Sequence, residues 1–196
     1  MHEDSSTSTT GKFILVIGPT GSGKSVLITY VRETFPEIIF PVTYTTREKR
    51  PGLENSSYRF IGIDEFKAME AAGDFIESAQ FGGNFYSTSK EEVSSGLKQG
   101  KILLKEMEVQ GVRQIQSILS PEQLVIMYID AGSWDELERR VRARAPITEE
   151  ELAKRKHRYE DEIPFKETAN FVIQNYPGEL EKAKEQIVSA INSIRI

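Results

Sequence analysis

The stretch GPTGSGKS, residues 18–25, decides the fold of this chain. It fits the pattern G-x-x-x-x-G-K-[ST], in which a glycine-rich loop holds the phosphates of a nucleotide. The apolar run KFILVI, residues 12–17, precedes it at the length of a strand, and VLITYV, residues 26–31, follows it as the start of a helix. Strand, glycine loop and helix are the context that the pattern requires. The sequence therefore predicts a binding site for a nucleoside triphosphate.

The chemistry of this loop follows from its residue types. Gly21 and Gly23 can take backbone conformations closed to residues with a β-carbon, so several N–H groups can point at one anion. The helix that follows adds its free N–H groups and its dipole to the same point. We expect Lys24 to reach the β- and γ-phosphates and the Ser25 hydroxyl to hold Mg²⁺. The predicted ATP-binding set of the loop is Gly18, Pro19, Thr20, Gly21, Ser22, Gly23, Lys24 and Ser25.

Length and composition set the outer bounds. A chain of 196 residues suits one α/β domain, which we place at 12–196 after a flexible polar lead-in at 1–11. The net charge of −5 argues against a nucleic-acid partner. No apolar run approaches the length of a membrane span, so we expect no membrane partner. The absence of cysteine excludes disulfides and fits a cytoplasmic location.

Strand and helix patterns alternate along most of the chain. Strands are expected at 12–17, 38–42, 58–61, 75–81, 84–86, 102–104, 124–129 and 170–173. Helices are expected from 26 to about 34, and at 64–72, 90–99, 109–119, 133–144, 148–161 and 180–194, with Asp64, Ser133 and Thr148 as caps. Apolar strands that alternate with helices predict a parallel sheet core covered by helices on both faces. The segment 43–89 is strand-rich and breaks this alternation, so it is interpreted as an insertion.

A series of motifs, in order, resembles the guanylate kinase family. The family order V-S-H-T-T-R, R-x-G-E, tyrosine, F-L-E and G-N-Y-Y-G-T-S is matched by Thr45-Thr46-Arg47, Arg50-Pro51-Gly52, Tyr58, Phe75-Ile76-Glu77 and the stretch 83–89. Downstream, Gln110-Gly111 matches its Q-G segment, residues 137–144 match its lid helix L-x-x-R-L-x-x-R, and residues 172–175 match V-I-V-N. The resemblance runs from about Phe13 to the last helix.

The resemblance implies a P-loop NTPase fold with three working parts. The core would comprise 12–42, 90–136 and 162–196, the GMP-binding insertion 43–89 and a helical lid 137–161. The implied reaction is the phosphorylation of GMP to GDP by ATP, with Mg²⁺ as cofactor. The implied partners are the small molecules GMP and ATP, and the expected assembly is a monomer or a homodimer.

The resemblance also assigns roles to single residues. Arg47 and Arg50 would clamp the GMP phosphate, since guanidinium groups match phosphate bidentately, and Tyr58 and Tyr86 would donate hydroxyl groups to it. Glu77 would accept from guanine N1–H and the 2-amino group, while the Thr43 hydroxyl would donate to O6. The implied GMP-binding set is Thr43, Arg47, Arg50, Tyr58, Glu77, Tyr86, Thr88 and Glu108.

The ATP side is assigned in the same way. Arg140, Arg144 and Arg155 of the lid would act with Lys24 as catalytic residues that stabilise charge on the transferring phosphoryl group. Asn175 would contact the adenosine end of ATP, and Glu106 would join Ser25 at Mg²⁺ through water. The family pattern is broken at Leu53 and Ser87, and its L-D-I-D segment is replaced by Lys105-Glu106-Met107-Glu108.

Two other readings stay open from the sequence. A related P-loop kinase for another phosphorylated acceptor, such as the ribosyl bisphosphate kinase of phosphonate metabolism, would keep the loop but would not need Glu77 to read guanine. A guanylate-kinase-like binding module with little catalysis would typically lose the loop. This chain retains Gly18, Gly23, Lys24 and Ser25, which counts against the module.

Overall fold

The computed structural model describes residues 10–49 and 57–195, and its core is a parallel sheet. The sheet contains β6 (Ile102–Glu106), β1 (Lys12–Ile17), β7 (Leu124–Asp130) and β8 (Phe171–Gln174), in that order. Neighbouring strands are parallel throughout, with Phe13 opposite both Leu103 and Leu124. The predicted α/β core is therefore confirmed.

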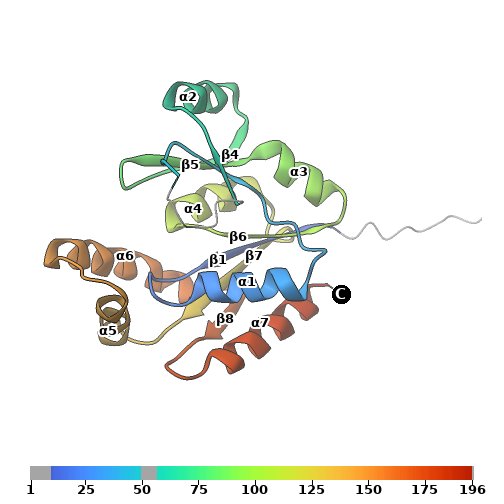
Figure 1. Ribbon diagram of the computed structural model, residues 1–196. Helices are drawn as coiled ribbons and strands as arrows, with labels where there is room; N and C mark the ends of the chain where they lie inside the picture. Colours follow the sequence, from blue (N-terminus) through green and yellow to red (C-terminus); the bar gives the residue numbers. More distant parts are fainter. Residues whose placement is uncertain (1–9, 50–56, 196) are drawn as a thin grey trace, which may run out of the picture.

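Both faces of this sheet are covered by helices, as the apolar runs predict (Figure 1). Phe13 and Leu15 of β1 pack into one buried cluster with α3 (Lys90–Lys98), α4 (Val109–Ile118) and part of α6 (Glu149–Thr168). Ile14 and Val16 point to the other face and pack against α1 (Lys24–Thr34) and α7 (Leu180–Ile194). Successive side chains of a strand alternate between faces, so a strand buried on both sides is apolar at every position.

A second sheet is formed by the insertion. It contains β3 (Tyr58–Phe60), β2 (Thr43–Thr45), β5 (Asn84–Ser89) and β4 (Phe75–Phe81), with α2 (Ile63–Ala72) lying against it. The β2–β3 pair is parallel, and the β2–β5 and β4–β5 pairs are antiparallel. Phe66 of α2 is fully buried, with ring centroids 5.0 Å from Phe75 and 5.3 Å from Phe85. This small aromatic core holds the insertion together.

The two helices that follow β7 leave the layered core. Figure 1 shows α5 (Trp134–Arg144) and α6 side by side at one end of the core sheet. The Thr148 hydroxyl caps α6 by accepting from Glu151 N–H at 3.2 Å, as the sequence predicts. Ser133 is the N-cap residue of α5, but its side chain makes no capping hydrogen bond within the part of the chain that is described. The side-chain cap predicted at Ser133 is therefore wrong.

Three predicted boundaries are also corrected. Residues 38–42 form only an isolated bridge, Ile39 to Leu103, because Pro41 has no N–H to donate, and the strand begins instead at Thr43. Helix α2 is capped by Gly62, which leaves Asp64 in its first turn. Helix α6 continues to Thr168 through Pro164, and Phe165 in that extension is buried against the core. Over the described ranges, none of the helices is both long and apolar enough to cross a lipid bilayer.

Candidate active site

The loop at residues 18–23 joins the carboxyl end of β1 to α1, where ligands of open α/β sheets bind. Gly21 and Gly23 have φ angles of 89° and 92°, values in the left-handed region that favours glycine. A β-carbon at position 23 would also collide with the side-chain amide of Asn175. The glycines at positions 21 and 23 are thus required by backbone conformation, and the glycine at position 23 also by close packing.

A cation, a hydroxyl and a carboxylate meet beside this loop. Lys24 Nζ lies 2.5 Å from Gly18 O and 3.2 Å from Pro19 O, and 3.6 Å from Glu106 Oε1. The Ser25 hydroxyl donates to Glu106 Oε2 at 3.5 Å. Hydroxyl and carboxylate oxygens are hard ligands that suit Mg²⁺, which keeps several waters and takes only one or two protein oxygens. Ser25 and Glu106 therefore fit the metal that the sequence predicts.

A pocket of about 310 Å³ opens beside the loop, between α1, α5 and the segment after β8. Asn175 forms part of the wall of this pocket. Its side-chain Nδ2 donates to Ser22 O at 2.7 Å, and its backbone carbonyl oxygen accepts hydrogen bonds from both Nη atoms of Arg140 at 3.1 Å. Arg140 also donates through Nε to Glu136 at 3.1 Å. The pocket is lined by Gly23, Val26, Arg140, Asn175, Tyr176, Pro177, Gly178 and Leu180.

Asp130, at the carboxyl end of β7, fixes this wall, and the sequence analysis missed it. Its carboxylate accepts from Tyr176 Oη at 2.9 Å and Gly132 N–H at 3.1 Å, and pairs with Lys166 Nζ at 2.8 Å. Burial raises the pKa of Asp130, but these donors outweigh burial and hold the pKa below its ordinary value. An acid as the last residue of a wholly buried strand is the signal that could have identified it.

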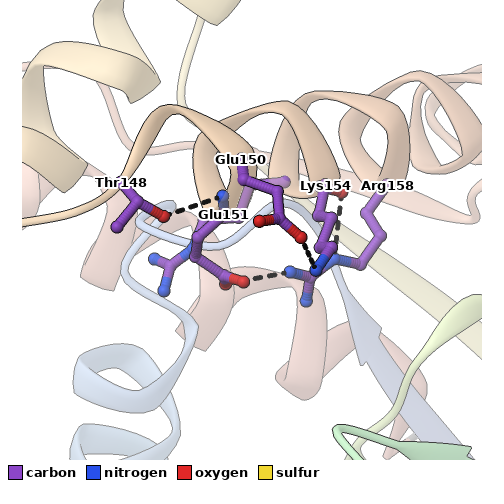
Figure 2. A network of polar contacts seen from close by, with 6 residues as sticks. Thr148, Glu150, Glu151, Lys154 and Arg158 are labelled. Carbon is purple, nitrogen blue, oxygen red and sulfur yellow. Dashed lines mark hydrogen bonds and ion pairs between the residues drawn. The ribbon is translucent and has the colours of Figure 1, made fainter.

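The lid arginines are held by acidic partners on their own helices. Arg155 Nε lies 3.1 Å and Arg158 Nη2 3.5 Å from the same oxygen, Glu151 Oε1. Figure 2 shows Glu151 and Arg158 on α6 near the Thr148 cap. Arg144 ends α5, and its side chain lies outside the described part of the structure. The structure thus brings Arg140 to the loop side of the site and leaves Arg155 paired on α6.

The insertion aligns three predicted GMP-binding residues across neighbouring strands. Thr43 lies opposite Thr88, and Thr88 lies opposite Glu77, on β2, β5 and β4. Glu77 is 6% exposed, and its Oε1 accepts from Thr88 Oγ1 at 2.6 Å. Burial raises the pKa of Glu77, against the hydrogen bonds from Thr88 and the charge of Lys105. The result is a buried carboxylate with hydroxyl groups in line beside it.

Arg47 supplies an unsatisfied cation to the same part of the molecule. Its guanidinium lies 5.1 Å from the Tyr58 ring centre and 5.6 Å from that of Phe60. Within residues 10–49 and 57–195, its buried Nη1 has no hydrogen-bond partner. A buried guanidinium N–H without an acceptor is costly and suits an anionic ligand. Tyr86 is on β5 opposite Thr45, and Arg50 lies outside the described residues.

A second unsatisfied group, Glu162 of α6, was not anticipated. It is 7% exposed, and its Oε2 has no partner among the described residues. Burial raises its pKa to about 7, with Lys24 opposing the rise and Glu108 adding to it. Glu108 itself is the N-cap residue of α4, directly after β6. Glu162 lies in a strongly charged helical stretch, where a solvated side chain is the usual expectation, so no pattern in the sequence indicates its burial.

Comparison with known proteins agrees with this geometry. The family model for guanylate kinase matches residues 10–194. The chain is 39% identical over 182 residues to a guanylate kinase of Trichormus variabilis, covering 92% of this chain and 89% of the relative. It is 35% identical over 182 residues to one of Nocardia farcinica, with 91% and 92% covered.

A solved structure shows the same fold. The crystal structure of guanylate kinase from Anaplasma phagocytophilum aligns with a TM-score of 0.71 at 24% identity, covering 97% of this chain and 88% of that chain. The phosphate loop, the buried carboxylate of the insertion and the sequence relatives lead to one conclusion. This chain belongs to the guanylate kinase family.

Proposed function

We infer that this chain transfers the γ-phosphoryl group of ATP to GMP and releases ADP and GDP. The observation that carries the inference is Glu77, a buried carboxylate that lies in line with the hydroxyl groups of Thr88 and Thr43. Guanine presents two adjacent donors, N1–H and the 2-amino group, beside the acceptor O6. A carboxylate and hydroxyl groups are the complementary set, and a buried set of this kind rejects a base with another pattern.

The donor nucleotide would occupy the loop and the neighbouring pocket. Loop N–H groups and Lys24 would hold the phosphates, and the adenosine end would enter the pocket beside Asn175. Mg²⁺, held by Ser25 and through water by Glu106, would neutralise phosphate charge. Lys24 would exchange the carbonyl oxygens of Gly18 and Pro19 for phosphate oxygens.

The acceptor would bind to the insertion. Arg47, with its unpartnered buried Nη1, would take the GMP phosphate, with Arg50, Tyr58 and Tyr86 completing the clamp. Glu108, at the start of α4, stays assigned to the GMP side by the family resemblance. No side chain forms a covalent intermediate in this scheme, because alignment of the two nucleotides and charge neutralisation account for the rate.

The lid would complete the site by closing. We propose that 137–161 moves relative to the core, 12–42, 90–136 and 162–196, and to the insertion 43–89. Arg140, Arg144 and Arg155 would then face the transferring phosphoryl group and exclude water, which would otherwise receive it. Arg155 starts from a pair with Glu151 and Arg140 from the carbonyl of Asn175, so both would exchange these partners for phosphate oxygens. A cytoplasmic monomer or homodimer remains our expectation.

The test is the product balance of the purified chain. With ATP, Mg²⁺ and GMP, chromatography should show ADP and GDP appearing in equal amounts, and chelation of Mg²⁺ by EDTA should stop both. ADP formed with a ribosyl bisphosphate and not with GMP would identify the chain as the related kinase. Binding of GMP without turnover would identify it as a binding module. Either result would contradict the proposed function.

A further inference from the structure

Lys105 is a buried lysine in the core sheet. It lies on β6 opposite Leu15 of β1, and it is 8% exposed. Lysine is almost never buried to this extent unless its charge is paired, because an ammonium group loses its hydration there. Lys105 also stands where the L-D-I-D pattern has leucine. A buried charge at an apolar position of a core strand therefore requires an interaction that compensates for its lost hydration.

The contacts of the ammonium group point to the link between the core and the insertion. Nζ lies 3.4 Å from Pro41 O and 3.4 Å from Val42 O, just before β2. From α3, Glu92 Oε2 accepts the N–H of Val42 at 3.2 Å. A cation of β6 and a carboxylate of α3, both core elements, thus hold the segment from which the insertion begins.

The charges around Lys105 connect it to the base-reading residue. Glu77 of β4 and Glu92 of α3 are the carboxylates that act on it, opposing the burial that lowers its pKa to about 8. Glu77 Oε1 accepts from the Thr88 hydroxyl, and the positive charge of Lys105 opposes the rise in the pKa of Glu77 that burial causes. The neighbouring α4 approaches Glu77 with its backbone: a β-carbon at Gly111 would lie 3.0 Å from Glu77 Oε2. Lys105 therefore supplies positive charge that favours the ionised form of a buried carboxylate.

We propose that Lys105 is a positioning residue for the acceptor nucleotide: it ties the 41–42 link to β6 and keeps Glu77 an anionic carboxylate that can accept from guanine. The proposal rests on the proposed GMP kinase function. It adds that recognition of guanine by Glu77 depends on the charge of Lys105, which belongs to the core sheet and not to the insertion. A protonated Glu77 would present an O–H toward the N1–H donor of guanine, which weakens binding of the base while leaving the phosphate loop untouched.

The test compares Lys105→Met with the wild type by steady-state kinetics from pH 6 to 7.5, where the wild-type lysine, with its pKa of about 8, keeps most of its charge. Without the cation the pKa of Glu77 rises further, so KM for GMP at pH 7 should increase about tenfold, the scale of losing a hydrogen bond to a charged group. It should fall again as pH rises and Glu77 ionises. The kcat at saturating GMP and the KM for ATP should stay within about twofold of the wild-type values. The lost interaction stabilises GMP equally in the ground state and in the transition state, so its loss weakens GMP binding without slowing the transfer step.

Two further variants separate charge from packing. Lys105→Gln keeps a donor for the 41–42 carbonyl groups without the charge, so it should show the same pH-dependent KM, and it replaces Lys105→Met if that variant does not fold. The control is Lys101→Met, which removes an exposed lysine just before β6 and should behave as wild type. Unchanged KM for GMP in a folded Lys105→Gln protein, or lost kcat with KM unchanged, would overturn the proposal. Wild-type protein inactive toward GMP would instead refute the function on which it rests.

Discussion

Lys24 is positioned to exchange its protein partners for phosphate. Its ammonium group lies within hydrogen-bond distance of Gly18 O and Pro19 O and is 3.6 Å from Glu106 Oε1. Lys24→Ala should lower kcat at least about a hundredfold, the scale seen when a preorganised charge partner is removed. Far-UV circular dichroism should stay unchanged, because the lysine is not part of the apolar core. The control Lys182→Ala removes an exposed lysine of α7 and should keep full activity. Near-normal turnover in folded Lys24→Ala protein would contradict the assignment of the loop.

Glu162 should make the stability of the fold depend on pH. Burial raises its pKa from 4.5 to about 7, so the folded protein binds this proton more tightly than the unfolded chain. The free energy of unfolding should therefore fall as pH rises from about 4.5 to 7, and the penalty is complete above 7, at roughly 3 kcal/mol or less. Glu162→Gln mimics the protonated form and should be more stable than wild type at pH 8 and equal to it near pH 5.

Urea unfolding at the two pH values measures this difference. Glu160→Gln, an exposed change on the same helix, serves as the control and should unfold like wild type at both pH values, because it retains Glu162. If Glu162→Gln and wild type unfold at the same urea concentration at pH 8, then ionisation of Glu162 does not lower the free energy of unfolding. That result would contradict the prediction.

At the residue scale, motif spacing and burial give different information. The loop glycines and Ser25 could be proposed from a motif whose chemistry imposes a spacing, and Glu77 could be proposed from the order of motifs that resembles the guanylate kinase family. Lys105 and Asp130 could not be assigned, because their roles depend on segments brought together only in the fold, residues 41–42 for one and Tyr176 for the other.

At the scale of elements, the helices α5 and α6 carry the arginine residues that we propose act in phosphoryl transfer. Arg155 is paired with Glu151 on α6 and would reach phosphate when the lid closes. Arg155→Ala should lower kcat at least about a hundredfold, as loss of an arginine that stabilises the transferring group does. The dissociation constant for GMP should change little, because the proposed GMP site lies on the insertion and not on the lid.

Calorimetry and initial rates together test this prediction. Arg142→Ala is the matched control, because Arg142 lies on the other lid helix and binds Glu138 and Glu149 at the surface. Weakened GMP binding in Arg155→Ala with kcat unchanged would assign the arginine to a different role.

The elements themselves were predicted well where apolar periodicity is strong. The strands of the core and the helices α1 and α7 follow from it, since their buried positions recur with the expected period. The stretch 38–42 reads as a strand because it is apolar, yet Pro41 prevents a full ladder. The end of α6 was missed because its last turns are fixed by Phe165 packing on the core, a tertiary contact.

At the scale of the whole molecule, the two sheets carry different parts of the proposed site. The core sheet presents the phosphate loop at the carboxyl ends of its strands, and the second sheet presents Glu77 and Arg47. Helix α4 joins them: Gln114 accepts from Ser78 N–H at 3.1 Å and donates to Ser78 O at 2.8 Å. Arg158 of α6 also lies over the ring of Phe81 on β4, 4.8 Å from its centre. A net charge of −5 requires that both anionic nucleotides be met by such local cations.

The central claim is that Glu77 reads guanine, and kcat/KM for GMP against AMP measures it most directly. Adenine places an acceptor at N1, so AMP would set a lone pair against the Glu77 carboxylate. Each unsatisfied buried group costs roughly 1–3 kcal/mol, so wild type should prefer GMP at least about a hundredfold. Glu77→Gln places an amide donor beside the guanine donors and should reduce that preference. Equal use of AMP and GMP by wild type, or unchanged selectivity in folded Glu77→Gln protein, would contradict the account.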